Sequence, residues 1–300
     1  MIGAHDGKRL IGALEAGGTK MICAIGSEDG TILERYSVPT RSPEETMPEI
    51  LGWFLEHKPA ALGIASFGPV DPDPASESYG HITTTPKPGW ADYDLLGTIK
   101  KVLPVPMGFD TDVNGSLLGE VSYGGSRGLN DVVYITVGTG IGGGVMSGGK
   151  LLHGMLHPEL GHMLMRPHPS DSYAGKCPFH GQCLEGLASG PAIEERWGLP
   201  GEKLSDRPEV WELEAYYLGQ AIVNLILCLS PKRIILGGGV MHQTQLFPLI
   251  RREVSTKLNG YIRTKELSDP DSYIVAASLK DDQGILGCIK LALNAMSFQS

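Results

Sequence analysis

The sequence predicts an α/β protein with two lobes, and three observations support this fold class. The chain has 300 residues, which is more than a single hydrophobic core usually holds. Strand-like and helix-like patterns alternate along it in two similar rounds. A glycine-rich turn between two strands stands at the matching point of both rounds. We therefore expect two lobes of β-β-β-α-β-α type with a cleft between them.

The first round opens with three short strands joined by glycine turns and continues with a helix that begins at a proline. Its strands are expected at residues 10–16, 21–25, 31–37, 61–67 and 105–109, and its helices at residues 43–57 and 113–123. Residues 68–92 are rich in Pro, Gly, Thr and Ser, which indicates a long ordered loop over a site. The N-terminal lobe is expected to span residues 1–118.

The second round repeats this order, so residues 119–300 are expected to form the C-terminal lobe. Its strands are expected at residues 132–137, 141–146, 233–236 and 273–277. Its helices are expected at residues 184–197 and 209–229, after Val240, and at about 283–296. The last of these helices is a candidate to pack on the N-terminal lobe.

The composition is that of a globular protein whose partner is a small molecule. Hydrophobic residues make up 41% of the chain and charged residues 20%, which suffices for two cores. A net charge of −9 without a local Lys/Arg cluster disfavours nucleic acid as a partner. Five cysteines, three of them in apolar surroundings, suit a reducing compartment. No stretch is apolar and long enough for a signal core or a membrane span, so we expect no membrane contact and a cytoplasmic location.

A short segment carries four soft or borderline metal ligands. These are His162, Cys177, His180 and Cys183. Imidazole nitrogens and thiolate sulfurs suit tetrahedral Zn²⁺, and structural sites fill all four positions with protein atoms. We therefore expect a structural zinc ion, because no position is left open for water. The alternative is a mobile loop in which Cys177 and Cys183 form a disulfide or remain free.

Three glycine-rich turns follow directly after predicted strands. They lie at residues 15–20, 136–144 and 236–240. Glycines let a backbone approach phosphate groups closely, and the third turn leads into a helix whose N-terminus favours an anion. Each turn taken singly is equally consistent with a tight connection. Two such hairpins at matching points of two lobes favour a nucleotide held from both sides. None matches the P-loop or dinucleotide fingerprints.

Asp112 lies where a strand gives way to a helix, in the segment Asp-Thr-Asp-Val-Asn at 110–114. A carboxylate there can accept a hydroxyl proton during phosphoryl transfer, while Asn114 can bind the substrate or hold the loop. The alternative role for Asp112 is that of a helix cap. Glu159, His162 and Glu185 suit the hydroxyl groups of a sugar. Their alternative role is support for the metal ligands.

These motifs together resemble those of the ROK family of sugar kinases, and more narrowly its zinc-containing bacterial fructokinases. The resemblance covers nearly the whole chain. It rests on Glu-Ala-Gly-Gly-Thr-Lys at 15–20, His-Pro-Glu-Leu-Gly-His at 157–162 and Cys-Pro-Phe-His-Gly-Gln-Cys-Leu-Glu-Gly-Leu-Ala-Ser-Gly-Pro-Ala at 177–192. It implies the two-lobed actin/hexokinase-like (ribonuclease H-like) ATPase fold with a structural zinc loop, and a homodimer.

The resemblance also implies residue roles. Asp112 would be the catalytic base, and the sugar would contact Asn114, Glu159, His162 and Glu185, with His162 also binding the metal. ATP with Mg²⁺ would contact Gly17, Gly18, Thr19, Lys20, Gly138, Thr139, Gly140, Gly190, Pro191, Gly237, Gly238, Gly239, Val240 and Met241. Most sugar kinases of this fold carry Asp where this chain has Glu15. Glu is typical of the fructokinase branch, and its role toward Mg²⁺ stays open.

The implied activity is the ATP-dependent phosphorylation of D-fructose to D-fructose 6-phosphate. A mannokinase or a relaxed hexokinase is the nearest alternative, because mannose and glucose share much of the hydroxyl geometry. A sensor that binds sugar without turnover is an alternative of another class, and such a protein would not need a base at Asp112. Four protein ligands argue against a zinc hydrolase. Pro86, Pro88 and Trp90 either shape the sugar pocket or only order their loop.

Overall fold

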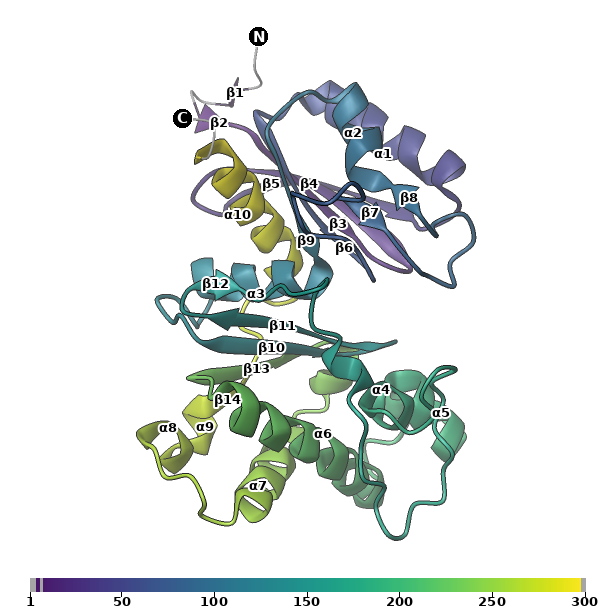
Figure 1. Ribbon diagram of the computed structural model, residues 1–300, viewed down its shortest axis with the longest axis vertical. Coiled ribbons are helices and arrows are strands. Elements are labelled where there is room, and N and C mark those ends of the chain that lie inside the picture. The colour runs from purple at the N-terminus through teal and green to yellow at the C-terminus, as the bar shows by residue number, and fades with distance from the viewer. Residues whose placement is uncertain (1–3, 6–7, 298–300) are drawn as a thin grey trace. The chain divides into compact units, whose positions relative to one another are not determined.

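The computed structural model describes residues 4–5 and 8–297, which form two compact units (Figure 1). Unit 1 comprises the chain up to Gly128, Leu151–Pro158, and the chain from Ser278 onward. Unit 2 comprises Leu129–Lys150 and Glu159–Ala277. The predicted boundary at residue 118 falls inside helix α3 (Asp112–Ser122), which belongs to unit 1. None of the helices in the described part of the chain has the length and apolarity that crossing a membrane requires.

Unit 1 is built on a five-stranded sheet with the strand order β5-β4-β3-β6-β9. Antiparallel pairs join β3, β4 and β5, whereas β6 and β9 run parallel to β3. The strand bounds are Ile11–Ala16 (β3), Lys20–Gly26 (β4), Ile32–Pro39 (β5), Ala61–Ser66 (β6) and Met107–Thr111 (β9). Two short strands, β1 (Ala4–His5) and β2 (Lys8–Arg9), pair antiparallel and precede this sheet in the chain.

Helices cover both faces of the unit 1 sheet (Figure 1). Helices α1 (Pro43–His57) and α2 (Leu95–Val102) pack on one face, where Leu14, Ile64 and Phe54 lie in one apolar cluster. Helices α3 and α10 (Gln283–Ser297) cover the other face. Because side chains alternate along a strand, neighbouring residues of β3 serve the two clusters.

The approach of α10 to β6 is close enough to require glycine. A Cβ added at Gly63 of β6 would lie 1.7 Å from the carbonyl oxygen of Cys288. Where α10 meets α3, a Cβ added at Gly287 would lie 1.7 Å from the carbonyl oxygen of Gly115. These glycines therefore let the backbone of the last helix rest directly on β6 and α3.

Unit 2 repeats the same strand order in a second five-stranded sheet, β12-β11-β10-β13-β14. Its strands are Val132–Val137 (β10), Ile141–Ser147 (β11), Lys150–Leu151 (β12), Arg233–Gly237 (β13) and Ile274–Ala276 (β14). As in unit 1, an antiparallel hairpin, here β10 and β11, is extended by parallel strands. The two similar rounds predicted from the sequence are thus confirmed.

The helices of unit 2 pack on its sheet around the long helix α6 (Pro208–Leu229). The others are α4 (Leu184–Ala188), α5 (Gly190–Trp197), α7 (Leu246–Leu258), α8 (Lys265–Ser268) and α9 (Pro270–Tyr273), with 3-10 turns at Leu160–His162, Gly201–Lys203 and Gly239–His242. The single helix predicted at 184–197 is wrong, because Ser189 is extended and caps α5, whose second residue is Pro191.

The loop predicted at residues 68–92 contains more structure than the sequence indicated. Strand β7 (His81–Ile82) lies within it and pairs with β8 (Tyr93–Asp94), which directly follows it. Helix α2 comes next. Trp90 is buried and its indole nitrogen donates to the carbonyl oxygen of Arg41 at 2.7 Å. The loop is therefore anchored to the N-terminal side of α1.

Candidate functional site

Asp112 is the first residue of α3, directly after β9. Thr111 caps this helix, since its hydroxyl oxygen accepts from the backbone N–H of Asn114 at 3.1 Å. Capping therefore does not require the Asp112 side chain, whose Oδ1 accepts from the N–H of Val113 at 2.8 Å. Burial raises the pKa of the Asp112 carboxyl to about 6. Such a group is ionised at neutral pH but is a stronger base than an exposed aspartate.

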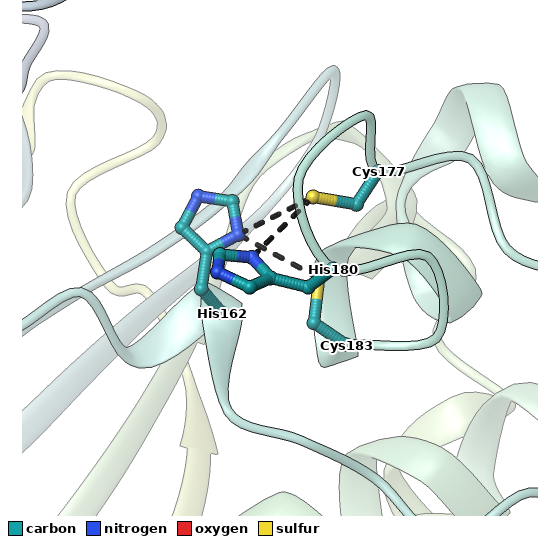
Figure 2. A group of neighbouring side chains, drawn as sticks. All are labelled: His162, Cys177, His180 and Cys183. Carbon is teal, nitrogen blue, oxygen red and sulfur yellow. Dashed lines mark hydrogen bonds between the residues drawn. The ribbon is translucent and has the colours of Figure 1, made fainter.

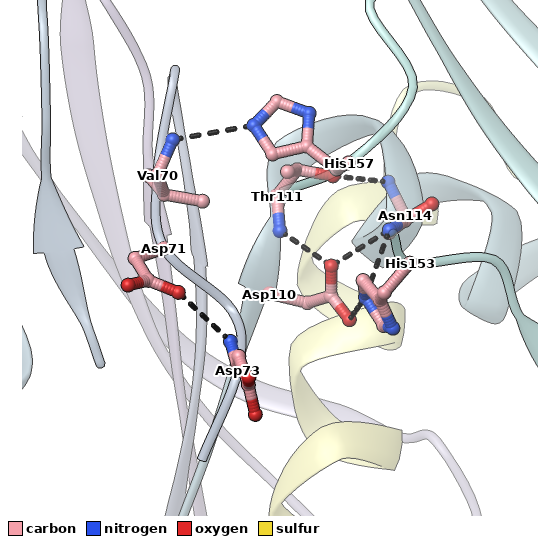
Figure 3. A network of polar contacts seen from close by, with 8 residues as sticks. All are labelled: Val70, Asp71, Asp73, Asp110, Thr111, Asn114, His153 and His157. Atoms are coloured by element: carbon pink, nitrogen blue, oxygen red, sulfur yellow. Dashed lines mark hydrogen bonds and ion pairs between the residues drawn. The ribbon is translucent and has the colours of Figure 1, made fainter. Parts of the chain in front are cut away.

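A polar network is centred on the buried Asp110, two residues before Asp112 in the chain (Figure 3). Asp110 accepts from the side-chain nitrogen of Asn114 at 2.7 Å and pairs with Nε2 of His153 at 2.9 Å. Its Oδ1 also accepts from the N–H of Thr111 at 2.8 Å. Asn114 is 1% exposed, and in this arrangement its side-chain amide holds Asp110. Its contact with a substrate stays a prediction.

The segment Leu151–Pro158 belongs to unit 1 and is held there through two histidines (Figure 3). The hydrogen bond to Asp110 raises the pKa of the His153 imidazole. Nε2 of His157 accepts from the N–H of Val70 at 3.2 Å, and burial lowers the pKa of this second imidazole. Sequence reasoning missed both residues. The signal that could have found them is a pair of histidines four residues apart, the second of which directly precedes the Pro-Glu-Leu-Gly-His motif.

The first glycine turn, Gly17–Lys20, is closed by its own backbone and fixed by Thr40. The N–H of Gly17 donates to the carbonyl oxygen of Lys20 at 3.1 Å. The Thr40 hydroxyl donates to the carbonyl oxygen of Gly17 at 2.7 Å, and the Thr40 N–H to that of Thr19 at 3.0 Å. The turn therefore has a fixed shape.

Glu15 is the penultimate residue of β3, just before this turn, and lies against the N-terminus of α10. A Cβ added at Gly284 would lie 2.5 Å from the Glu15 carboxyl group. Burial, and next the negative charge of Asp112, raise the pKa of Glu15 to about 7. The two carboxyl groups are thus electrostatically coupled within unit 1, and a cation there would favour ionisation of both.

Unit 2 brings together the other predicted nucleotide segments. The N–H of Gly190 donates to the carbonyl oxygen of Gly138 at 2.8 Å. Gly238 has φ +89°, and a Cβ added there would lie 2.5 Å from the carbonyl oxygen of Val137. The turn Gly138–Gly140, the start of α5 and the turn after β13 therefore converge. Thr139 and Gly239 are exposed there, whereas Met241 is buried.

Glu185 adjoins the second glycine turn. It lies in the first turn of α4, and its Oε2 accepts from the N–H of Ile141 at 3.0 Å. A Cβ added at Gly140 would lie 2.8 Å from the same oxygen. Glu159 is exposed and precedes the 3-10 turn that carries His162. Gly161 of that turn rests on the carbonyl oxygen of Ile141, since a Cβ there would lie 1.7 Å away. Strand β11 thus positions both glutamates.

The four predicted metal ligands meet in unit 2 (Figure 2). Their ligand atoms all lie within 4.8 Å of one another. Sγ of Cys177 lies 3.7 Å from Nδ1 of His162 and 3.7 Å from Nδ1 of His180, and Sγ of Cys183 lies 3.6 Å from Nδ1 of His162. Tetrahedral zinc, with Zn–S bonds of about 2.3 Å and Zn–N bonds of about 2.0–2.1 Å, separates sulfur from nitrogen by about 3.6 Å. The cluster can therefore hold a zinc ion.

A pocket of about 460 Å³ lies elsewhere on unit 2, and none of the predicted site residues lines it. Arg196 and Asp171 in its wall form an ion pair at 3.2 Å, and Asp171 accepts from the Tyr217 hydroxyl at 2.6 Å. Glu214, on α6, is fully buried, and burial raises its pKa well above the ordinary value. The contacts of Asp171 hold the segment between His162 and Cys177 against α5 and α6.

Known proteins resemble this chain over nearly its whole length. The sequence matches the ROK family over residues 11–295. A protein of Bacillus subtilis (strain 168) is 51% identical over 97% of this chain and 98% of its own length. A fructokinase of Pediococcus pentosaceus is 45% identical over 96% of this chain and 99% of its own.

The crystal structure of a ROK family glucokinase from Streptomyces griseus, in complex with glucose and AMPPNP, is similar in fold. It has a TM-score of 0.74 at 24% identity, covering 95% of this chain and 99% of that one. This likeness confirms the predicted actin/hexokinase-like fold. From the match over residues 11–295 and the relatives of high identity, the chain belongs to the ROK family.

Proposed function

We propose that the protein transfers the γ-phosphoryl group of ATP to the 6-hydroxyl of D-fructose, yielding D-fructose 6-phosphate and ADP. The observation that carries the proposal is a buried, weakly acidic Asp112 at the start of α3, in a ROK chain that is 45% identical to a fructokinase. Asp112 would accept the proton of the attacking hydroxyl as the new O–P bond forms. Asp110 and Asn114 would fix the loop that presents it.

The nucleotide would be held mainly by backbone. The hydrogen-bonded turn Gly17–Lys20 in unit 1 and the converging turns of unit 2 are rich in glycine, which would let phosphate groups approach their backbone closely. Mg²⁺ bound with ATP would neutralise charge on the phosphates. Glu15 and Asp112 are the carboxyl groups of unit 1 whose pKa values a nearby cation would lower. Glu159, His162 and Glu185 would contact sugar hydroxyls.

The Cys/His cluster would hold a structural zinc ion. Four protein ligands leave no open position, so the ion would contribute stability and not a reacting water. The ion would also fix the 3-10 turn that carries His162. Another of its ligands, Cys183, directly precedes α4, the helix that carries Glu185. A homodimer is expected from the family, and light scattering of the purified protein tests it.

A coupled assay of ADP release tests the proposal, with ATP and Mg²⁺ against fructose, mannose and glucose at equal concentrations. Fructose should give the highest kcat/KM. Turnover fastest with mannose or glucose would replace fructose by that sugar. Fructose binding without ADP release from any sugar would instead indicate a sensor, and the base role of Asp112 would be withdrawn.

A further inference from the structure

Lys87 lies against the first glycine turn, although its loop is almost seventy residues further along the chain. A Cβ added at Gly18 would lie 2.9 Å from Cε of Lys87 and 3.6 Å from its Nζ. Any side chain at position 18 would therefore displace this lysine. Gly18 thus allows both the turn and the approach of the ammonium group to it.

The Lys87 ammonium group has no anionic partner in the described part of the chain. None of the ion pairs found there includes it. The residue is half-buried, and Nζ lies 5.9 Å from the centre of the Phe67 ring, at the outer limit of a cation–π contact. A partly desolvated cation without a counter-ion favours an anion from solution.

The loop around Lys87 is held firmly, so the position of the ammonium group is defined. The carbonyl oxygen of Lys87 accepts from the N–H of Trp90 at 3.2 Å. Trp90 is 1% exposed and its indole donates to Arg41. A Cβ added at Gly89 would lie 2.9 Å from Cδ of Pro43 at the start of α1. The buried tryptophan therefore orders the loop and aims its lysine at Gly18.

We propose that Lys87 binds the γ-phosphate of ATP at the turn Gly17–Thr19 and remains with that group during transfer. This inference rests on the proposed kinase function. The bond from the fructose 6-oxygen to phosphorus forms while the bond to the β,γ-bridging oxygen breaks. The hydroxyl proton passes to Asp112, and ADP leaves with the bridging oxygen. Lys87 forms no covalent bond, and its charge offsets the negative charge on the phosphoryl oxygens.

The test replaces the charge while keeping the aliphatic stem, with Lys87→Met. Lys101→Met on the exposed last turn of α2 is the matched control. Dissociation constants are measured for AMPPNP, ADP and fructose, together with kcat for fructose phosphorylation. Loss of one donor to a developing negative charge typically lowers kcat by about 10²–10³. We therefore expect that loss for Lys87→Met, with AMPPNP binding weakened at least tenfold and ADP and fructose binding changed less than threefold. Lys87→Arg should recover part of the rate, and Lys101→Met should match the native protein.

Three results would overturn the assignment. AMPPNP affinity and kcat within threefold of the native values would show that the lysine touches no phosphate. A loss confined to fructose binding would place Lys87 at the sugar. A native protein that binds neither AMPPNP nor ADP would remove this inference and the kinase function together, whereas the first two results leave the kinase function intact. Circular dichroism and Tm of each variant verify that it is folded.

Discussion

Replacing Asp112 by Asn should affect activity and stability in opposite directions. Asparagine has nearly the same shape but cannot accept the hydroxyl proton, and general-base catalysis typically contributes about 10²–10⁴ in rate. We expect kcat to fall by that factor. In the native protein, kcat/KM should fall about tenfold per pH unit below pH 6, because burial raises the pKa of Asp112 to about 6 and the protonated carboxyl is inactive.

The stability change follows from the same pKa. Burial raises the pKa of Asp112 from its ordinary value of 3.8 to about 6 in the folded protein. A raised carboxyl pKa means that ionised Asp112 disfavours folding at any pH above 6, and that this cost disappears below pH 3.8. Two units correspond to at most about 3 kcal/mol. Asp112→Asn should therefore raise the free energy of unfolding at pH 8 by up to about 3 kcal/mol, and it should also ease the ionisation of Glu15.

Urea denaturation at pH 8, beside the ADP-release assay from pH 5.5 to 8.5, measures both effects. Asp110→Asn is the matched control, because this carboxylate is satisfied by Asn114, Thr111 and His153. With asparagine at this position one of these donors would lack an acceptor, and a buried polar group left without its partner typically costs about 1–3 kcal/mol, so the free energy of unfolding should fall by about that amount. The reasoning fails if Asp112→Asn retains a third of the native rate, or if it is less stable than the native protein at pH 8.

Three further predictions concern the surroundings of the site. His153→Gln should lower the free energy of unfolding by about 0.5–1 kcal/mol at pH 6, since the His153–Asp110 pair is partly exposed. Because the pKa of His153 is raised in the folded protein, this loss should shrink toward pH 9. An equal loss at both pH values in urea titrations would contradict this prediction. The purified protein should hold one zinc ion per chain, measured by atomic emission. Chelation of the metal or Cys183→Ser should lower Tm, because metal binding stabilises the folded state. Cys228→Ser, at an exposed cysteine outside the cluster, should leave Tm unchanged. Gly63→Ala should destabilise unit 1 by about 1–3 kcal/mol or more through overpacking against Cys288, while Gly52→Ala, with no atom within 4 Å of its added Cβ, should be neutral or stabilising in thermal melts.

Local patterns in the sequence were enough to predict most of the fold. The strands predicted at residues 10–16 and 132–137 could be recognised from short runs of apolar residues, and glycines marked the hairpin turns that follow them. The helix predicted at 184–197 was wrong because Ser189 and Pro191 interrupt it with a cap and a restricted backbone. Helix α2 was missed because it follows a loop whose proline and glycine content dominated the interpretation.

The sequence by itself indicated the candidate metal ligands, because Cys177, His180 and Cys183 lie within one short loop and so come close together. It also determined Asp112 as the residue at a strand-to-helix junction. Only the tertiary structure decided that His153 pairs with Asp110, 43 residues away, and that Lys87 reaches Gly18. Such contacts join elements that the chain itself keeps apart. They depend on which faces the strands and helices bury, and no local periodicity records that choice.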